Sequence, residues 1–392
     1  MKSETRPRPK KNRSKSASAR RRWWFQAHAW IGLQLSILLG FVFVTGTFAV
    51  FSHEIDWLLE PAMRAPVAVP AEEIAWGAAF DAARRERPEA AWITLDRPVG
   101  PAFAVQAVVR TTWQEPVRLW LSPQDGQLLG ESGWMNAQRL LRMLHRHLML
   151  PPKVGVPIVS ALALPLLVSL VSGLIVYRKF WRGFFRKPRF ERRARLVLGD
   201  LHRLAGVWGS WFVALIALTG TWYLVESLGG RAPAFPETIP PTERGVPVPA
   251  SFDGARLDQA IAAARRSIPD LVVQRIQFPD EADGPIVVTG DAAAVLVRVR
   301  ANRVSVDPVT GDVLGRTRGE TLGLHQRIAE AADPLHFGTF GGLPTKLLWF
   351  LGGLLMTALA LTGVAIYTER VRQGAPARLP EPTDDLEASP AA

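Results

Sequence analysis

The stretch WIGLQLSILLGFVFVTGTFAVF, residues Trp30–Phe51, contains no Asp, Glu, Lys, Arg or His. A helix that rises about 1.5 Å per residue needs about 20 apolar residues to cross a hydrocarbon core of about 30 Å. Three further runs meet this requirement: Val154–Tyr177, Leu204–Val225 and Leu347–Tyr367. A signal peptide has one apolar stretch, and a shorter one. The sequence therefore predicts an α-helical membrane protein with four transmembrane helices.

The formal charge of +12 is concentrated in two segments beside these runs. Residues 1–22 hold ten Lys/Arg and one Glu, and residues 178–203 hold ten Lys/Arg against Glu191 and Asp200, so the remainder is net acidic. The positive-inside rule assigns such segments to the cytoplasm, and no nucleic-acid partner is needed to explain them. The chain has no cysteine, which excludes disulfides, Cys-ligated iron–sulfur clusters and thiolate zinc sites.

The expected organisation alternates spans with material on the two sides of a membrane. In order it comprises a disordered basic cytoplasmic tail (1–22), a first span (23–53), a periplasmic domain (54–135), a lead-in and second span (136–177), a basic cytoplasmic loop (178–203), a third span (204–226), a second periplasmic domain (227–333), a lead-in and fourth span (334–367) and a disordered cytoplasmic tail (368–392). Both periplasmic domains are expected to be α+β.

Within those domains, hydrophobic periodicity and turn signals predict short elements. Helices are expected at Ala71–Arg87, Asn136–Leu150 and Leu257–Ile268. Strands are expected at Ala102–Arg110, Val117–Leu121, Val272–Phe278, Ile286–Thr289, Ala294–Arg300 and Arg303–Val306, and a Pro-rich linker at Arg231–Pro249.

The chain also looks duplicated. His28-x3-Gly32 and His202-x3-Gly206 open the first and third spans, and each is followed after seventeen residues by a Thr-Gly pair, Thr45-Gly46 and Thr219-Gly220, at one common offset of 174. His145 precedes Ser172-Gly173 by 27 residues, and His336 precedes Thr362-Gly363 by 26. The sequence therefore predicts two tandem helix–domain–helix repeats.

Two copies in the same orientation imply a pseudo-twofold axis along the membrane normal. His28 then faces His202 near the cytoplasmic surface, and His145 faces His336 near the other. Two facing imidazoles can ligate both sides of a haem iron, so two haems are expected, one in each leaflet. A single interfacial histidine is more often a plain polar residue; the paired pattern favours ligands here.

Several residues leave alternatives open. His147 competes with His145, and His325 is a second choice for His336 or a contact near the substrate; His53 is expected on the far surface. Three arginines, Arg142, Arg146 and Arg203, can pair with haem propionates, or they snorkel to the interface as ordinary cations. No catalytic residue is assigned beyond the haem ligands.

Four motifs resemble the PepSY-associated transmembrane family over roughly residues 20–370: Leu-His-Arg-His-Leu at 144–148, Leu-His-Arg-Leu-x-Gly at 201–206, Pro-Leu-His-Phe-Gly at 334–338 and the turn Asp-Pro-Val-Thr-Gly at 307–311. The resemblance implies an inner-membrane ferric-siderophore reductase that carries two b-type haems. It also implies PepSY-like periplasmic domains, a type regarded as protease-inhibitory when isolated.

The leading hypothesis is that electrons cross the membrane through both haems and reduce Fe(III) in a periplasmic ferric siderophore, which releases the less tightly held Fe(II). The chain has no Gly-x-Gly-x-x-Gly fingerprint, and its cytoplasmic loop is too short for a nucleotide domain, so a separate cytoplasmic reductase or quinol must be the donor. Two alternatives are a quinol-linked haem carrier with a protein acceptor and a haem-free PepSY protein that regulates a periplasmic peptidase.

Overall fold

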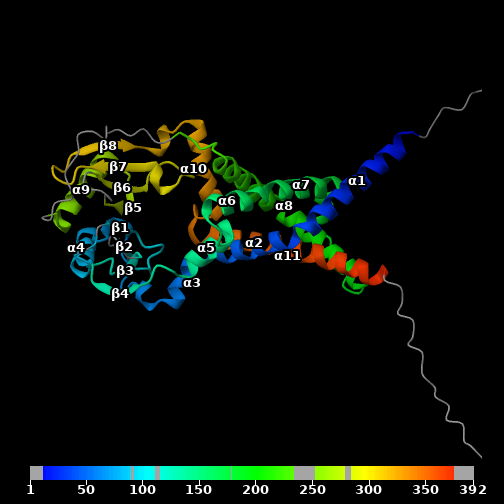
Figure 1. Ribbon diagram of the computed structural model, residues 1–392, viewed down its shortest axis with the longest axis horizontal. Helices are drawn as coiled ribbons and strands as arrows, with labels where there is room; N and C mark the ends of the chain where they lie inside the picture. Colours follow the sequence, from blue (N-terminus) through cyan, green and yellow to red (C-terminus); the bar gives the residue numbers. More distant parts are fainter. Residues whose placement is uncertain are drawn as a thin grey trace, which may run out of the picture.

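The computed structural model describes residues 12–88, 90, 92–110, 115–177, 179–233, 252–278 and 284–374. It consists of a long helical bundle with a β-sheet domain at one end (Figure 1). The start of α1 and the end of α11 both lie at the other end of the bundle (Figure 1). The expected Pro-rich linker beyond Pro233, and the outer parts of both expected tails, lie outside the described residues.

Three helical stretches are long and apolar enough to cross a membrane: α6 with α7 (Pro152–Ala161 and Ala163–Val176), α8 (Ala194–Ser227) and α11 (Gly342–Gly374). A fourth is α1 (Asn12–Gln34) with α2 (Ser36–Ala49), if this pair, bent by 65°, is one span. At the bend the Ser36 hydroxyl donates to the Leu33 carbonyl (2.8 Å), a local bond that competes with the helical ladder. All four predicted apolar runs are thus helical over nearly their whole length.

The helices extend beyond the expected spans, which corrects three boundaries. The basic tail was expected to be disordered to residue 22, but α1 begins at Asn12. Helix α8 starts at Ala194, inside the expected loop, and α11 continues to Gly374, inside the expected tail. Arg, Lys, Ala and Leu are good helix formers, so helical hydrogen bonding continues after the apolar sequence has ended.

The eight strands of the described residues form one antiparallel sheet in the order β4-β3-β2-β1-β5-β6-β7-β8. The strands are β1 (Trp92–Asp96), β2 (Val105–Arg110), β3 (Val117–Leu121), β4 (Leu128–Ser132), β5 (Val272–Gln277), β6 (Ile286–Asp291), β7 (Asn302–Val306) and β8 (Val313–Thr317). β1 pairs with β5, so the two separately expected domains share one sheet. Because of this pairing, β1 and β5 are not edge strands, whose backbone N–H and C=O groups would otherwise lack partners.

One hydrophobic core underlies both halves of the sheet. Helices α4 (Trp76–Glu86) and α9 (Gly254–Ser267) cover one face, where strand residues such as Leu95 and Ile276 are fully buried. The helices cross at Gly77 and Gly254, and a Cβ on either glycine would lie within 2.5 Å of the carbonyl oxygen of the other. Each glycine N–H donates to an aspartate of the opposite helix: Gly77 to Asp258 (3.1 Å) and Gly254 to Asp81 (2.7 Å).

The strand predictions were partly right. Val117–Leu121 matches β3, and β2, β5, β6 and β7 match within a few residues, but β1, β4 and β8 were missed. The expected strand Ala294–Arg300 is wrong: this segment is irregular and ends in the 3-10 turn η5 (Val299–Ala301). Here Arg298 and Arg300 turn toward Glu330, and ion pairing overrides strand propensity.

Three helices join the sheet domain to the bundle: α3 (Ser52–Leu59), α5 (Ala137–His147) and α10 (Leu324–Phe337) (Figure 1). The buried carboxylate of Asp56 on α3 accepts from Asn136 Nδ2 and from the Ala137 N–H, both at 2.7 Å. Asn136 in turn caps α5 through the Arg139 N–H. The start of α5 is therefore fixed to the end of the first span. Shorter 3-10 turns are η1 (Pro61–Met63), η2 (Ala71–Glu73), η3 (Phe180–Gly183) and η6 (Gly319–Thr321).

Candidate functional site

Four histidines meet in two pairs inside the bundle. His28 on α1 and His202 on α8 have ring centres 6.2 Å apart. His145 on α5 and His336 on α10 have ring centres 6.1 Å apart. His336 reaches α8 at Thr219, seventeen residues beyond His202, which is about 25 Å along a helix that rises about 1.5 Å per residue. The two pairs therefore lie at different depths in the bundle.

The first member of each pair is held by a backbone carbonyl. His28 Nδ1 lies 3.0 Å from the Ser169 carbonyl oxygen, and His145 Nδ1 lies 2.9 Å from that of Val42. A carbonyl only accepts, so each Nδ1 carries the proton. In a neutral imidazole the lone pair is then on Nε2.

His202 and His336, the second histidines of the two pairs, are also protonated on Nδ1, and their partners are threonine hydroxyls. His202 Nδ1 lies 2.9 Å from Thr362 Oγ1, and His336 Nδ1 lies 2.9 Å from Thr219 Oγ1. Each hydroxyl donates its single proton to a carbonyl of its own helix, that of Ala358 (2.6 Å) or Leu215 (2.9 Å). The histidines must therefore donate, and all four imidazoles keep Nε2 as a free electron-pair donor.

Three glycines lie against the rings, and at Gly46 the approach is too close for a side chain. A Cβ on Gly46 would lie 2.6 Å from Cε1 of His145, one on Gly173 would lie 3.4 Å from Cε1 of His28, and one on Gly363 would lie 3.8 Å from Cε1 of His202. The sequence analysis used the Thr-Gly and Ser-Gly pairs as repeat markers. Their recurrence at fixed spacing from each histidine was the available signal that they support the rings.

The competing histidines lie elsewhere. On α5 the His147 ring has a buried Nδ1 with no partner among the described residues, and its backbone packs against Gly155. His325 is exposed and contacts Trp222, with ring centres 5.5 Å apart. His53 was expected on the surface but is half-buried beside Glu54 and Lys346, and burial lowers its pKa to about 4.

The three predicted arginines differ in surroundings. Arg203 forms an ion pair with Asp200, which Arg189 also binds, so this guanidinium already has a carboxylate partner. Arg142 and Arg146 are exposed on α5, one turn before His145 and directly after it. Their pairing with a haem propionate stays a prediction.

A half-buried polar cluster next to His336 was not expected from the sequence. The ring of Tyr223 lies 5.2 Å from that of His336, and its hydroxyl donates to Asp333 Oδ1 (2.8 Å). Arg298, from the sheet domain, donates to the same carboxylate oxygen (2.9 Å) and also faces Glu330. This cluster ties α8, α10 and the sheet domain together around the second histidine pair.

Each pair can hold one metal ion between its two Nε2 atoms. The described residues contain no group of three or more His, Cys, Asp or Glu side chains placed to hold a metal ion.

Comparison with known proteins identifies the family. The family model described as PepSY-associated TM region matches residues 25–370. A Pseudomonas aeruginosa relative, Uncharacterized protein PA4219, is 29% identical over 225 residues, which cover 53% of this chain and 55% of the relative. The chain thus spans about half the length of the curated relative that it matches. Because the family match covers both histidine pairs and nearly all of the bundle and sheet, the chain belongs to the PepSY-associated TM family.

Proposed function

We propose that the protein binds two b-type haems and carries electrons across the membrane to reduce Fe(III) in a ferric siderophore. The observation that carries this proposal is the pair of facing imidazole sets, each with Nδ1 engaged and Nε2 free. The sheet domain would then be periplasmic, and both chain ends cytoplasmic.

The distances and tautomers fit haem. A histidine nitrogen binds a metal at about 2 Å, so two imidazoles on opposite sides of one ion have ring centres about 6 Å apart. The observed separations are 6.2 and 6.1 Å. Metal-binding histidines almost always donate their other N–H to a carbonyl or similar acceptor, as all four do here. A porphyrin supplies the remaining four ligands, and the absence of cysteine favours b-type over covalently attached haem.

When bound between two histidines, haem supplies a one-electron Fe(III)/Fe(II) couple without an open coordination position, which suits electron transfer. The chain contributes orientation through the Nδ1 bonds, and its apolar helices exclude water. The buried side chains Phe212, Val213, Trp349 and Met356 fill the bundle where α8 packs against α11.

The pair formed by His145 and His336 lies nearer the sheet domain, because α5 and α10 join that domain to the bundle (Figure 1). A ferric siderophore is therefore expected to accept electrons at this end, and Fe(II), a softer ion, is held less tightly by oxygen donors. The donor would be a cytoplasmic reductase or quinol at the opposite end.

We also infer that the chain is a tandem duplication. Both halves of the sheet contribute four strands, and the halves meet at β1 and β5. Each half adds one helix, α4 or α9, with a glycine in its first turn. The N–H of that glycine donates to an aspartate of the other helix. The first span of each half carries one histidine, His28 or His202. It also carries a Thr-Gly pair that lies beside a histidine of the other pair.

Optical spectroscopy of the detergent-purified protein, oxidised and dithionite-reduced, tests the proposal together with a pyridine haemochrome assay. We expect about two b haems per chain, and their reoxidation when a ferric siderophore is added to reduced protein. Haem without siderophore-dependent reoxidation would leave a carrier that serves another acceptor. A folded protein without a Soret band, expressed with an adequate haem supply, would refute electron transfer and favour the haem-free PepSY regulator.

A further inference from the structure

The segment Lys179–Phe190, termed the return segment, is fixed against the outside of α8. The indole N–H of Trp208 donates to the Phe184 carbonyl (3.0 Å), and the two rings are in edge contact. Arg189 donates through Nε and Nη2 to the two carboxylate oxygens of Asp200, at 2.7 and 3.0 Å. Two anchor points on α8 therefore give the segment a defined position.

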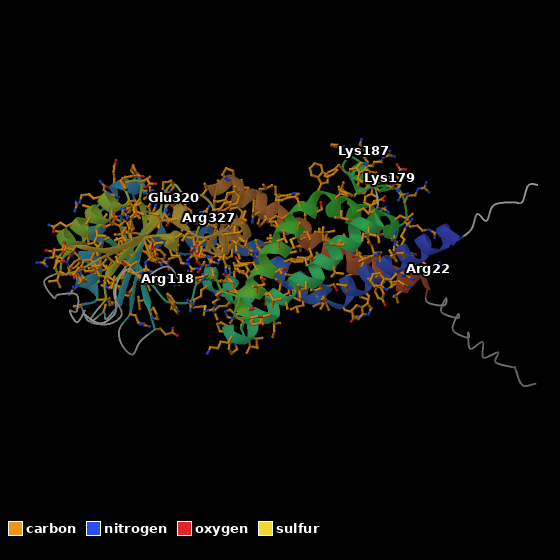
Figure 2. All side chains as sticks on the ribbon, turned by 90° about the horizontal axis from the view of Figure 1, so that it is seen from above. Arg22, Arg118, Lys179, Lys187, Glu320 and Arg327 are labelled. Atoms are coloured by element: carbon orange, nitrogen blue, oxygen red, sulfur yellow. The ribbon has the colours of Figure 1, made fainter. Side chains whose placement is uncertain are left out.

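That position is level with the apolar part of α8. Arg203 is the last charged residue before the apolar run, and Trp208 lies five residues beyond it, about 7 Å further along the helix. Figure 2 shows the segment on the flank of the bundle, with Lys187 further than Lys179 from the end that carries Arg22. After α7 the chain therefore turns back toward the middle of the bundle.

The outer surface of the return segment carries exposed aromatic rings and exposed cations. Phe185 is 91% exposed, Phe190 69% and Trp181 58%. Four exposed cations alternate with them, and none has a carboxylate partner in the described part of the chain: Lys179, Arg182, Arg186 and Lys187. Aromatic rings and snorkelling cations side by side are typical of segments at the boundary between headgroups and acyl chains.

We propose that the return segment is a binding site for the headgroups of anionic phospholipids, with its aromatic rings inserted between the acyl chains. Positive charge fits such headgroups, and each Lys or Arg close to an anionic surface adds to the attraction. A soluble acidic protein is a poorer fit, because the rings lie level with the apolar part of a membrane helix and such a partner would have to enter the bilayer. This inference does not depend on haem.

The site has a structural consequence for α8. The carboxylate that anchors the segment belongs to Asp200, two residues before His202. Lipid bound by the return segment would therefore hold the part of α8 that carries His202 at one depth in the membrane.

The chain has no cysteine, so single introduced cysteines report on single positions. The test places a fluorescent label at Phe185→Cys in the full chain, reconstituted in nanodiscs of phosphatidylcholine with or without phosphatidylglycerol, and measures quenching by aqueous iodide. Ile37→Cys on α2, 86% exposed, serves as the reference for lipid. Val309→Cys, 44% exposed in the turn between β7 and β8, serves as the reference for water.

We expect the label at 185 to be quenched several-fold less than that at 309, and less again when phosphatidylglycerol is present. Replacing the four free cations by Gln should remove the effect of phosphatidylglycerol, while the labels at 37 and 309 remain unchanged and confirm the fold. High salt should weaken the effect, since it screens exposed charges.

Two outcomes would overturn the proposal. A label at 185 as accessible to iodide as that at 309 in both lipids would place the return segment in water, where it is free to meet an acidic protein. If inorganic phosphate added to phosphatidylcholine nanodiscs reproduced the effect of phosphatidylglycerol, the cations would be a general phosphate site and not one for lipid.

Discussion

Replacing Gly46 by alanine gives the sharpest test of the second histidine pair. The added Cβ would lie 2.6 Å from Cε1 and 2.8 Å from Nδ1 of His145, whereas carbon atoms in contact are about 3.5–4.0 Å apart. The ring must therefore withdraw by about 1 Å, which breaks its bond to the Val42 carbonyl. A metal-binding constellation tolerates displacements of about 0.5 Å, so binding at this pair should fail.

Overpacking of this kind lowers the free energy of unfolding by about 1–3 kcal/mol, whereas the higher helix propensity of alanine raises it by about 1 kcal/mol. The matched control is Gly32→Ala, because a Cβ there meets nothing within 4 Å and only the propensity gain remains. Pyridine haemochrome assays should find about one haem in the Gly46 variant and two in the control, and the Gly46 variant alone should have a lowered melting temperature. Two haems with unchanged spectra, together with a melting temperature raised as in the control, would refute this reasoning.

Three further predictions concern other parts of the molecule. Substituting His202 with alanine should remove one haem and leave the spectrum of the other; loss of both from folded protein would mean that the pairing with His28 is wrong. Alanine at Gly77 should destabilise the sheet domain by about 1–3 kcal/mol in thermal melts, because its Cβ would meet the backbone of α9, whereas Gly133→Ala should be neutral. His53 has a pKa lowered to about 4 by burial, so its contribution to stability is complete above about pH 6.5 and is lost as the pH falls toward 4. A His53→Gln variant should flatten that part of the curve of melting temperature against pH, and an unchanged slope would exclude this histidine as its origin.

The membrane helices could be predicted from the sequence because the physics is local. A run such as Leu204–Val225 satisfies the length and polarity requirements of a span without reference to any other residue. The helix ends could not be predicted in this way, because Ala194–Arg203 is polar enough for a loop and is helical only as a continuation of the span. The β1–β5 pairing could not be predicted either. The two strands are about 180 residues apart, and the sequence of neither strand specifies which strand it pairs with.

The histidine pairs could be predicted because an inferred duplication turns sequence spacing into an expected arrangement of the histidines in space. The offset of 174 residues brings His28 opposite His202 once the copies pack about a common axis, and the ring contacts agree with that prediction. Asp333 was missed for the opposite reason: the corresponding place before His145 in the first copy holds Arg142, so no repeat marks it. A cluster present in one copy only can be found only from the folded structure.

The difference between the two copies bears on how the second pair would work. His336 contacts Tyr223, whose hydroxyl is bonded to Asp333, whereas His145 sits in a helix with arginines at 142 and 146. Opposite charges thus flank the two rings that face one another, and the Arg298 contact to Asp333 links this asymmetry to the sheet domain. Charge close to a redox centre tunes its potential. Because this asymmetry belongs to the second pair, we expect a haem bound between His145 and His336 to differ in potential from one bound between His28 and His202.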